Sequence, residues 1–221
     1  MVEKGARPDV PQELSPRRIP ERIEAEFITS AASLSQCPRD ELPEVAVAGR
    51  SNAGKSSVLN RITGNRRLAR TSKTPGRTQL LNFFATRPGG RLVDLPGYGF
   101  AKVSRDKRQT WQQHVEDYLS RRDNLIGMLL VMDIRHPFQP FDQQLIGWAG
   151  QSQLALHILL NKADKLKYGA RVRALRAAEQ RLAASSGAPG SEGATVQVFS
   201  ASNGLGNEQA IEWLTKRLTL P

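Results

Sequence analysis

The sequence of 221 residues has one cysteine, few aromatic residues and no long hydrophobic run. Its only cysteine, Cys37, excludes a disulfide within the chain and favours a reducing compartment, so a cytoplasmic protein is expected. The longest apolar stretch, residues 125–132, has the length of a strand and is too short to span a bilayer. The proline-rich, charged beginning of the chain lacks the apolar core of a signal peptide. These absences argue against a disulfide-stabilised scaffold and a membrane protein.

Histidine is also scarce, which limits the possible metal chemistry. His114 and His136 have no metal-ligand spacing around them, and His157 lies in an apolar segment, where a hydrogen-bonded core role is expected. The chain has no internal repeat and no heptad pattern. Its length therefore predicts one domain, residues 25–221, after a disordered leader, residues 1–24.

The net charge of +11 is concentrated in one part of the sequence. Residues 61–110 contain 12 basic and 2 acidic side chains, a local charge of +10, whereas residues 1–44 contain 6 basic and 9 acidic side chains. A basic segment often forms only a solvated face, but this density also suits a polyanionic partner such as RNA. In the same segment, Phe83 and Phe84 could stack on RNA bases, although strand alternation should turn one of them into the core.

A phosphate-binding loop is predicted at residues 49–56, which spell G-x-x-x-x-G-K-S. An apolar segment typical of a buried strand precedes it, and residues 57–62 follow it with helical spacing. A glycine-containing turn is the alternative, but the strand and helix on either side favour the phosphate loop. Backbone N–H groups and the helix N-terminus would bind phosphates. Lys55 would reach the β- and γ-phosphates, and the Ser56 hydroxyl would hold Mg²⁺.

The pattern along the chain predicts an α/β fold with helices on both faces of the sheet. Strands are expected in seven segments, and helices follow most of them. A long polar loop is expected at residues 64–79, and the strands at residues 80–86 and 91–94 should form an antiparallel hairpin. The expected strands are residues 27–29, 45–48, 80–86, 91–94, 125–132, 154–160 and 195–199. The expected helices are residues 57–62, 106–119, 141–148, 170–184 and 208–218, with a helical turn at residues 31–36.

Two further motifs fall at strand ends, where ligands bind in such sheets. Asp94 is followed three residues later by Gly97, and in a nucleotide hydrolase such an aspartate orients Mg²⁺, commonly through water, while the glycine amide senses the γ-phosphate. Residues 161–164, Asn-Lys-Ala-Asp, would select the base, because the Asp164 carboxylate can accept two hydrogen bonds from guanine and none of that kind from adenine. Each motif by itself could be merely a turn.

The rest of the base pocket is expected around these residues. Asn161 would brace the pocket, and the stem of Lys162 would lie along the base plane. After the last strand, Ser200 and Ala201 would complete the pocket, with the Ala201 N–H aimed at guanine O6. Asp164 argues against the alternative of a P-loop kinase or ATPase.

Four strings of this sequence resemble the EngB (YihA/YsxC) family: residues 25–30, residues 42–52, Pro-Gly-Arg-Thr-Gln at residues 75–79 and Asp-Leu-Pro-Gly-Tyr-Gly-Phe-Ala at residues 94–101. The resemblance covers about residues 25–218. It implies a P-loop NTPase with a Ras-like G domain and a six-stranded, mostly parallel sheet. It also implies a monomeric bacterial GTPase that assembles the large ribosomal subunit and is needed for normal division and septation. Many members have threonine in place of Asn161.

The resemblance also assigns roles to individual residues. Thr78 would be the first-switch threonine that contacts Mg²⁺, although the sequence alone leaves Thr71 and Thr74 as alternatives. Tyr98 stands where Ras-like GTPases have a water-orienting glutamine, and a phenol cannot do the same work, so unaided hydrolysis should be slow. Asn52 resembles the asparagine that helps to bind K⁺ in related GTPases; the alternative is a polar loop residue that binds no ion.

The predicted site can now be stated in full. The residues expected in catalysis are Lys55, Thr78 and Gly97. Those expected at Mg²⁺ are Ser56, Thr78 and, through water, Asp94. Those expected to bind GTP are Gly49, Arg50, Ser51, Asn52, Ala53, Gly54, Lys55, Ser56, Ser57, Gly76, Arg77, Thr78, Gln79, Leu80, Asp94, Leu95, Pro96, Gly97, Asn161, Lys162, Ala163, Asp164, Phe199, Ser200 and Ala201.

The sequence allows two kinds of macromolecular partner for such a switch. GTP would order residues 70–79 and 95–105, within the basic segment, so that the nucleotide state would control binding to ribosomal RNA or a pre-ribosomal particle. The alternative is a regulator of cell division that uses the same switches on a protein partner and does not bind RNA.

Overall fold

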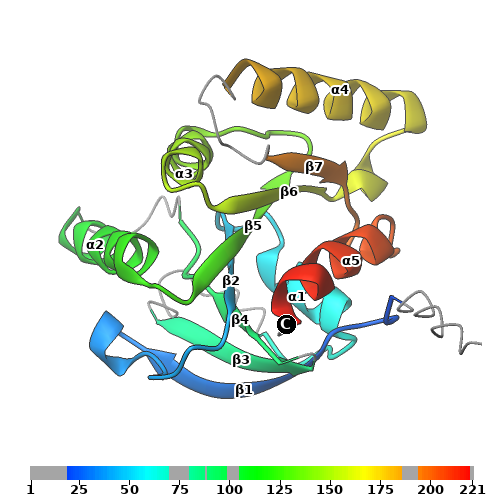
Figure 1. Ribbon diagram of the computed structural model, residues 1–221. Coiled ribbons are helices and arrows are strands. Elements are labelled where there is room, and N and C mark those ends of the chain that lie inside the picture. The colour runs from blue at the N-terminus through cyan, green and yellow to red at the C-terminus, as the bar shows by residue number, and fades with distance from the viewer. Residues whose placement is uncertain (1–18, 70–79, 88, 99–104, 186–193, 220–221) are drawn as a thin grey trace, which may run out of the picture.

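A seven-stranded sheet runs through the molecule, with helices on both faces (Figure 1). The computed structural model describes residues 19–69, 80–87, 89–98, 105–185 and 194–219, with side chains except at 105–112 and 185. The strands lie in the order β1-β3-β4-β2-β5-β6-β7, and β3 alone runs against the others. The strands are β1 (Glu24–Ala31), β2 (Glu44–Gly49), β3 (Leu81–Arg87), β4 (Arg91–Asp94), β5 (Leu125–Asp133), β6 (Ala155–Asn161) and β7 (Thr195–Val198).

The prediction of a six-stranded sheet is wrong, because β1 adds a seventh strand at one edge. The sequence indicated only a short strand at residues 27–29, yet β1 has eight residues, and its last one, Ala31, was expected in a helical turn. That turn is confined to η1 (Leu34–Gln36). An edge strand buries little surface, so β1 has no continuous apolar run, and its pairing with β3 comes from the backbone ladder, which sequence patterns do not reveal.

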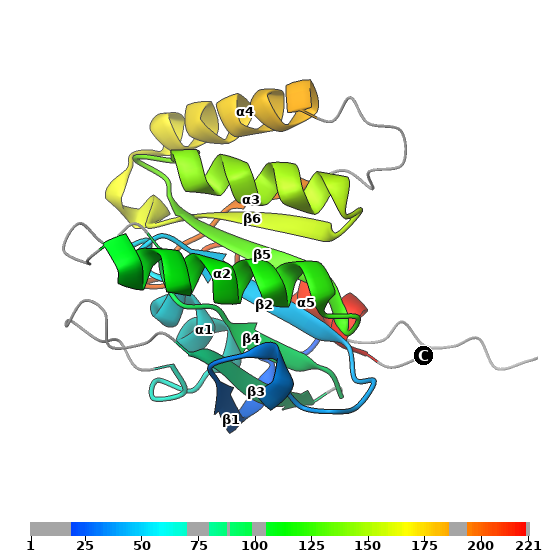
Figure 2. The ribbon, with the colours of Figure 1, turned by 90° about the vertical axis from the view of Figure 1, so that its left-hand side faces the viewer.

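The helices divide between the two faces as the α/β pattern predicts. Two pack on one face and three on the other, and Figure 2 shows the three-helix face toward the viewer. On the first face lie α1 (Lys55–Thr63) and α5 (Asn207–Leu218); on the second lie α2 (Arg105–Arg121), α3 (Pro140–Gln151) and α4 (Tyr168–Ser185). In the part of the chain that the structure describes, no helix is both long and apolar enough to cross a bilayer.

Successive residues of the inner strands enter two separate cores. Phe83 packs with Tyr118 on the α2 face, whereas Phe84 packs with the α1 and α5 side chains. Both rings are buried, so neither is free to stack on RNA bases, and the expectation that only one faces the core is corrected. The reason is that β3 is covered by protein on both sides, and each buried ring contributes about 1.5–3 kcal/mol.

The parallel strands end at one edge of the sheet, and the predicted motifs meet there. The segment 50–54 follows β2, Asp94 ends β4, Asn161 ends β6, and Ser200 comes two residues after β7. The antiparallel pairing of β3 with β4 confirms the predicted hairpin. His157, within β6, bonds Thr195 and Gln197 of β7 at 2.7 and 2.8 Å, which confirms its structural role.

Candidate nucleotide-binding site

The segment between β2 and α1 has the backbone of a phosphate-binding loop. Asn52 and Gly54 take left-handed conformations, with φ of 67° and 95°, and the Ala53 N–H donates to the Arg50 carbonyl at 2.9 Å. Gly54 is the N-cap of α1, and among the described residues no side chain caps that helix. The first-turn N–H groups are therefore available to an anion.

Position 54 must be glycine also because of its closest neighbour, Asn161. A Cβ atom added there would lie 2.4 Å from the Asn161 Nδ2, a distance that real contacts do not reach. Asn161 belongs to the base-recognition motif, which is more than a hundred residues further along the chain. The glycine thus allows the base loop and the phosphate loop to come into direct contact.

The two charged groups predicted at the phosphates contact each other. The Lys55 Nζ donates to the Asp94 Oδ1, and both side chains are about nine-tenths buried. Asp94 is placed by the end of β4, where the following Leu95 N–H donates to the Val47 carbonyl at 3.0 Å. The amine and the carboxylate therefore converge beside the loop that would hold the β- and γ-phosphates.

The residues present fit a Mg²⁺ ion of the kind that is bound largely by phosphate and water. Ser56 follows Lys55 in the first turn of α1, and its hydroxyl and the Asp94 carboxylate are oxygen donors that the chain offers next to the phosphate loop. In the described ranges, no three His, Cys, Asp or Glu side chains form a metal cluster. Mg²⁺ in such sites needs only one or two protein ligands, because the phosphates supply the others.

The loop after β4 is attached to the phosphate loop through its backbone. The Ser51 N–H donates to the Tyr98 carbonyl at 2.7 Å. A Cβ atom on Gly97 would lie 3.7 Å from both the Gly49 carbonyl oxygen and the Ser51 nitrogen. Gly97 thus lies directly against the phosphate loop, as a residue that senses the γ-phosphate requires.

The phenol of Tyr98 is held within the protein. Its hydroxyl donates to the Asp142 carboxylate in the first turn of α3, its ring centroid lies 4.5 Å from that of Phe141, and the residue is 4% exposed. Burial, reinforced by the Asp142 charge, raises the pKa of Tyr98 far above its usual value, so the phenol stays protonated. A side chain held in this way is part of the scaffold under the loop.

Asn161 joins the two recognition loops. Its Nδ2 donates to the Ala53 carbonyl at 2.8 Å, and its Oδ1 accepts from the Ala201 N–H at 3.2 Å. The side chain is 2% exposed and uses both ends of its amide. Asn161 therefore braces the pocket, as the sequence predicts, by connecting the phosphate loop with the segment that follows β7.

Lys162 connects the phosphate loop with the end of β5. Its backbone is left-handed, with φ of 65°, and its Nζ donates to the Asn52 carbonyl at 2.5 Å. The same Nζ lies 3.0 Å from the Asp133 Oδ2, and Arg135 donates two hydrogen bonds to that carboxylate. The Arg135 hydrogen bonds are the main reason that the pKa of Asp133 lies well below its usual range. Sequence reasoning assigned no role to Asp133 or Arg135.

Asp164 is oriented by the loop after β7. The Ser200 Oγ donates to the Asp164 Oδ1 at 2.7 Å, and this bond is the largest cause of a lowered pKa of Asp164. The Ala163 N–H donates to the Phe199 carbonyl at 3.0 Å, so the two strand ends are tied together. The Asp164 carboxylate is thus ionised, oriented and partly exposed, as recognition of the guanine edge requires.

Arg61 is a supporting residue that the sequence did not indicate. From α1, its Nε donates to the Ala201 carbonyl at 2.8 Å and its Nη2 to the Ser202 carbonyl at 2.6 Å. These bonds attach the last base-pocket loop to the helix that begins at the phosphate loop. No spacing signal could reveal them, because the partners are about 140 positions apart and meet only through the packing of α1.

The remaining predicted residues are either described by the structure, as buried or exposed residues, or lie outside its described part. Leu95 and Pro96 are buried, so they could reach a ligand only through their backbone, whereas Ser57 and Leu80 are exposed. The predicted residues that lie outside the described part of the chain are Gly76, Arg77, Thr78 and Gln79, together with the alternatives Thr71 and Thr74.

Comparison with known proteins identifies the family. The family described as 50S ribosome-binding GTPase matches residues 44–162, which is more than half of the chain. The chain belongs to this family of GTPases. It is thus a GTP-binding GTPase.

Solved structures show the same fold for this GTPase. A probable GTP-binding protein engB has 21% sequence identity and a TM-score of 0.62, over 79% of this chain and 98% of that chain. A mutant of the NFeoB protein of S. thermophilus, bound to GDP·AlF4⁻, has 22% identity and a TM-score of 0.57, over 80% of this chain and 65% of that chain. A bacterial selenocysteine-specific elongation factor EF-Sec has 18% identity and a TM-score of 0.54 over 81% of this chain. This GTPase covers 29% of the EF-Sec chain, which is much longer.

Proposed function

We propose that this GTPase is a nucleotide-dependent switch in the assembly of the large (50S) ribosomal subunit, and that normal cell division and septation need it. The EngB-like strings of the sequence and the match to the 50S ribosome-binding GTPase family support this role. In this proposal the protein is a cytoplasmic monomer, residues 25–221 act as one G domain after the leader at residues 1–24, and the partner is the subunit or its precursor.

The observation that carries the choice of nucleotide is the bracing of the base pocket. Asn161 holds the phosphate loop and the last loop in one arrangement, and Ser200 orients Asp164. A base that offers two adjacent N–H donors to Asp164 is preferred, which selects guanine over adenine. The pocket is formed by the protein's own hydrogen bonds, so little ordering opposes binding.

In the proposed mechanism, the chain supplies position and charge. The first-turn N–H groups of α1 and the Lys55 amine bind the phosphates, and Lys55 exchanges its contact with Asp94 for one with the β- and γ-oxygens. Ser56, Thr78 and, through water, Asp94 would hold Mg²⁺, which would supply positive charge at the phosphate oxygens. The Gly97 N–H then bonds the γ-phosphate and attaches the second loop to it.

Slow intrinsic hydrolysis follows from the position of Tyr98. The residue that would orient the attacking water in a Ras-like enzyme is here a buried phenol bonded to Asp142. The water must therefore be placed by the backbone, by another side chain or by a partner. Stimulation by the ribosomal particle or by K⁺ is expected.

We place the K⁺ effect at Asn52 in the phosphate loop. Its backbone is left-handed, its side chain is exposed, and its carbonyl accepts from Lys162. An amide oxygen at this position suits a monovalent cation next to the phosphates, where the added charge would replace an arginine finger. Hydrolysis should be faster in K⁺ than in Na⁺ buffer, and Asn52→Ala should remove the difference. Equal turnover in the two buffers would contradict the K⁺ site.

Co-sedimentation with purified 50S particles tests the role in assembly. Binding should be stronger with a non-hydrolysable GTP analogue than with GDP, and should weaken as salt is raised from about 50 to about 200 mM. Asp164→Asn is the matched variant, because it should lose the response to guanine nucleotides and keep its fold. Absence of binding in every nucleotide state would favour the protein-binding regulator of division instead.

A further inference from the structure

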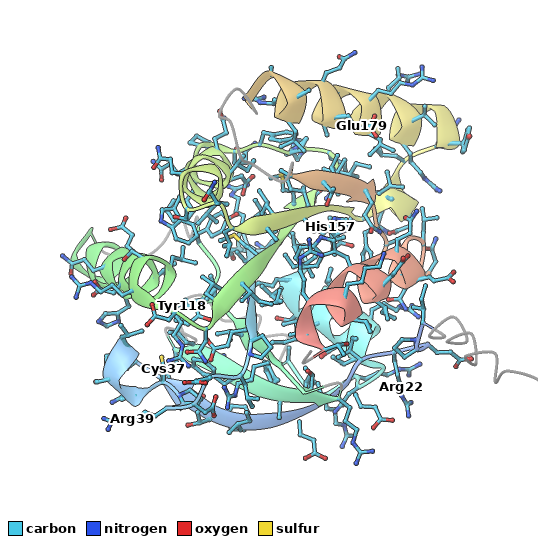
Figure 3. All side chains as sticks on the ribbon, viewed as in Figure 1. Arg22, Cys37, Arg39, Tyr118, His157 and Glu179 are labelled. Carbon is cyan, nitrogen blue, oxygen red and sulfur yellow. The ribbon has the colours of Figure 1, made fainter. Side chains whose placement is uncertain are left out.

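A hollow with an arginine-rich rim lies at the end of α1 that is remote from the phosphate loop. It has a volume of about 450 Å³, and its lining includes Arg22, Arg66 and Arg67. Since α1 has nine residues, this hollow lies about 13 Å along the helix from Lys55. Figure 3 labels Arg22 near the start of β1, whereas Glu179, on α4, lies on the opposite side of the molecule. The hollow is therefore separate from the GTP site.

Arg22 is held in place by the residues around it. The next residue, Ile23, is fully buried, and its N–H donates to the Ile62 carbonyl at the end of α1, at 3.0 Å. Gly64 has φ of 65°, and a Cβ atom there would lie 2.8 Å from the Arg22 Cδ. The missing side chain at Gly64 makes room for the arginine stem, so the guanidinium is directed over the turn after α1.

The backbone that carries the other two arginines is also well braced. The Arg67 N–H donates to the Asn65 Oδ1 at 3.0 Å, and the Asn60 Nδ2 donates to the Arg66 carbonyl at 3.0 Å. Gly64 closes the turn with an N–H bond to the Arg61 carbonyl at 3.2 Å. Three guanidiniums from two distant segments are thus presented together by a fixed backbone.

Among the residues that the structure describes, no acidic side chain forms an ion pair with these guanidiniums. Arg22, Arg66 and Arg67 are exposed, and in the described ranges none of their guanidiniums takes part in an ion pair or hydrogen bond. Glu24 also lines the hollow, but its carboxylate lies 3.7 Å from the guanidinium of a fourth arginine, Arg87. By contrast, Arg91 and Arg122, which serve the fold, are mostly buried and paired with Glu44. Within the described part of the chain, the rim therefore keeps a surplus of positive charge.

We propose that this arginine hollow binds the phosphodiester backbone of RNA. The planar fork of guanidinium matches a phosphate group, and exposed arginines on a fixed surface bind a backbone without reading its sequence. The inference rests on the proposed function, because a ribosomal particle presents RNA phosphate over most of its surface. RNA is favoured over an acidic protein because Arg66 and Arg67 belong to the strongly basic segment at residues 61–110, whose charge density is complementary to that of a phosphodiester backbone.

The test compares two triple variants of the full-length GTPase that remove the same charge. Arg22→Ala/Arg66→Ala/Arg67→Ala empties the rim of the hollow, and Lys167→Ala/Arg173→Ala/Arg176→Ala removes three exposed basic side chains at or near α4. The probe is a fluorescein-labelled RNA hairpin of about 30 nucleotides, whose affinity is measured by anisotropy from about 50 to about 200 mM salt. Binding of GDP is measured on both variants as the control for folding.

The hollow variant should bind the hairpin at least tenfold more weakly at about 100 mM salt. Its slope of log Kd against log salt should fall by about 2–3, as expected when three phosphate contacts are lost. The α4 variant should stay within about threefold of the unaltered protein, and both should bind GDP normally. Poly-glutamate and inorganic phosphate, added as competitors at equal charge, should displace the hairpin poorly.

Several outcomes would overturn the proposal. Equal weakening in the two variants would mean that only net charge matters, and a larger effect at α4 would move the RNA surface there. Efficient displacement by poly-glutamate would assign the hollow to an acidic protein, and displacement by phosphate would assign it to a free anion. If the hollow variant still co-sediments with 50S particles as the unaltered protein does, the hollow fails and the proposed function stands. If the unaltered protein binds neither hairpin nor 50S particles, both fail.

Discussion

The base end and the phosphate end of the site differ in how their side chains are held. At the base end, Asn161 and Asp164 are fixed by hydrogen bonds to loops that belong to the same pocket. At the phosphate end, Lys55 and Asp94 hold each other, and in the proposed mechanism both find new partners when phosphates bind. The base end is thus arranged to recognise the base, whereas the phosphate end contains the Lys55–Asp94 ion pair, which phosphates would have to displace.

In the proposed function, this difference would allow one site both to bind the nucleotide and to switch. Preorganised groups contribute affinity without a conformational cost, so the base end can anchor GTP and GDP equally well. When phosphates displace the nearly buried Lys55–Asp94 ion pair, the charge of the ligand would affect the loop after β4, which begins at Asp94. That loop is hydrogen-bonded to the phosphate loop through the Tyr98 carbonyl. A ligand can shift the switch only through contacts that differ between GTP and GDP, and such contacts lie at the phosphate end.

The largest effect should come from breaking the phosphate end. Lys55→Ala removes the amine that stabilises charge on the transferred phosphoryl group, so single-turnover GTP hydrolysis should fall by about 10²–10³-fold. Lys216→Ala, which removes an exposed lysine paired with Glu212, is the control and should change the rate less than twofold. Circular dichroism would check that the unpaired Asp94 has not unfolded the protein. Hydrolysis within tenfold of normal in folded Lys55→Ala would show that the amine is not at the phosphates.

Breaking the base end should change specificity more than chemistry. Asp164→Asn exchanges a charged acceptor pair for one acceptor and one donor, so GTP affinity should fall by roughly 10²-fold, or about 3 kcal/mol. Xanthosine nucleotides should then bind better than guanosine nucleotides, because the amide can donate to their additional carbonyl. Asp123→Asn, on an exposed residue, is the matched control in a calorimetric titration. An unchanged preference for GTP would place the guanine edge elsewhere.

A substitution at the contact between the two ends should affect both. Gly54→Ala forces a side chain into a left-handed conformation, at about 1–2 kcal/mol, and against the Asn161 amide. GTP and GDP affinity should each fall at least tenfold. Gly147→Ala, in the middle of α3 with nothing within 4 Å of its added Cβ, should instead raise the free energy of unfolding by about 0.5–1 kcal/mol. Similar nucleotide affinity in the two variants would contradict direct contact between the loops.

The smallest expected effect is a pH dependence of the free energy of unfolding, caused by His157 in β6, next to β7 and below the base end of the site. Burial lowers the pKa of His157 below its usual value of 6.5, so in the folded protein the ring stays neutral where the unfolded chain takes up a proton. The free energy of unfolding should therefore rise with pH below 6.5, by up to about 1.4 kcal/mol per unit, and level off above it. His157→Gln should flatten this slope in urea titrations, whereas His136→Gln, on an exposed histidine, should leave it unchanged. A native slope that survives His157→Gln would assign it to other groups.

Much of the fold and of the site could be predicted because their signals are local. The strand before the phosphate loop, the helix after it and the apolar segment at residues 125–132 are contiguous patterns, and they correspond to β2, α1 and β5 within a few residues. The edge strand β1 was underestimated because its stability comes from pairing with β3, and half of its residues are exposed. The six strands that the family resemblance implied were one too few, whereas the seven segments expected from the pattern along the chain match the seven-stranded sheet.

By itself, the sequence determined which chemical groups stand at the phosphate loop and at the base motif, because a glycine pattern and a four-residue turn act over short distances. Only the tertiary structure decided that Gly54 must leave room for Asn161, that Arg61 holds the last loop, and that Arg22 joins Arg66 and Arg67 around one hollow. Each of these contacts joins segments about 40 to 140 positions apart. Their positions depend on how the helices pack on the sheet, and no short pattern along the chain specifies that packing.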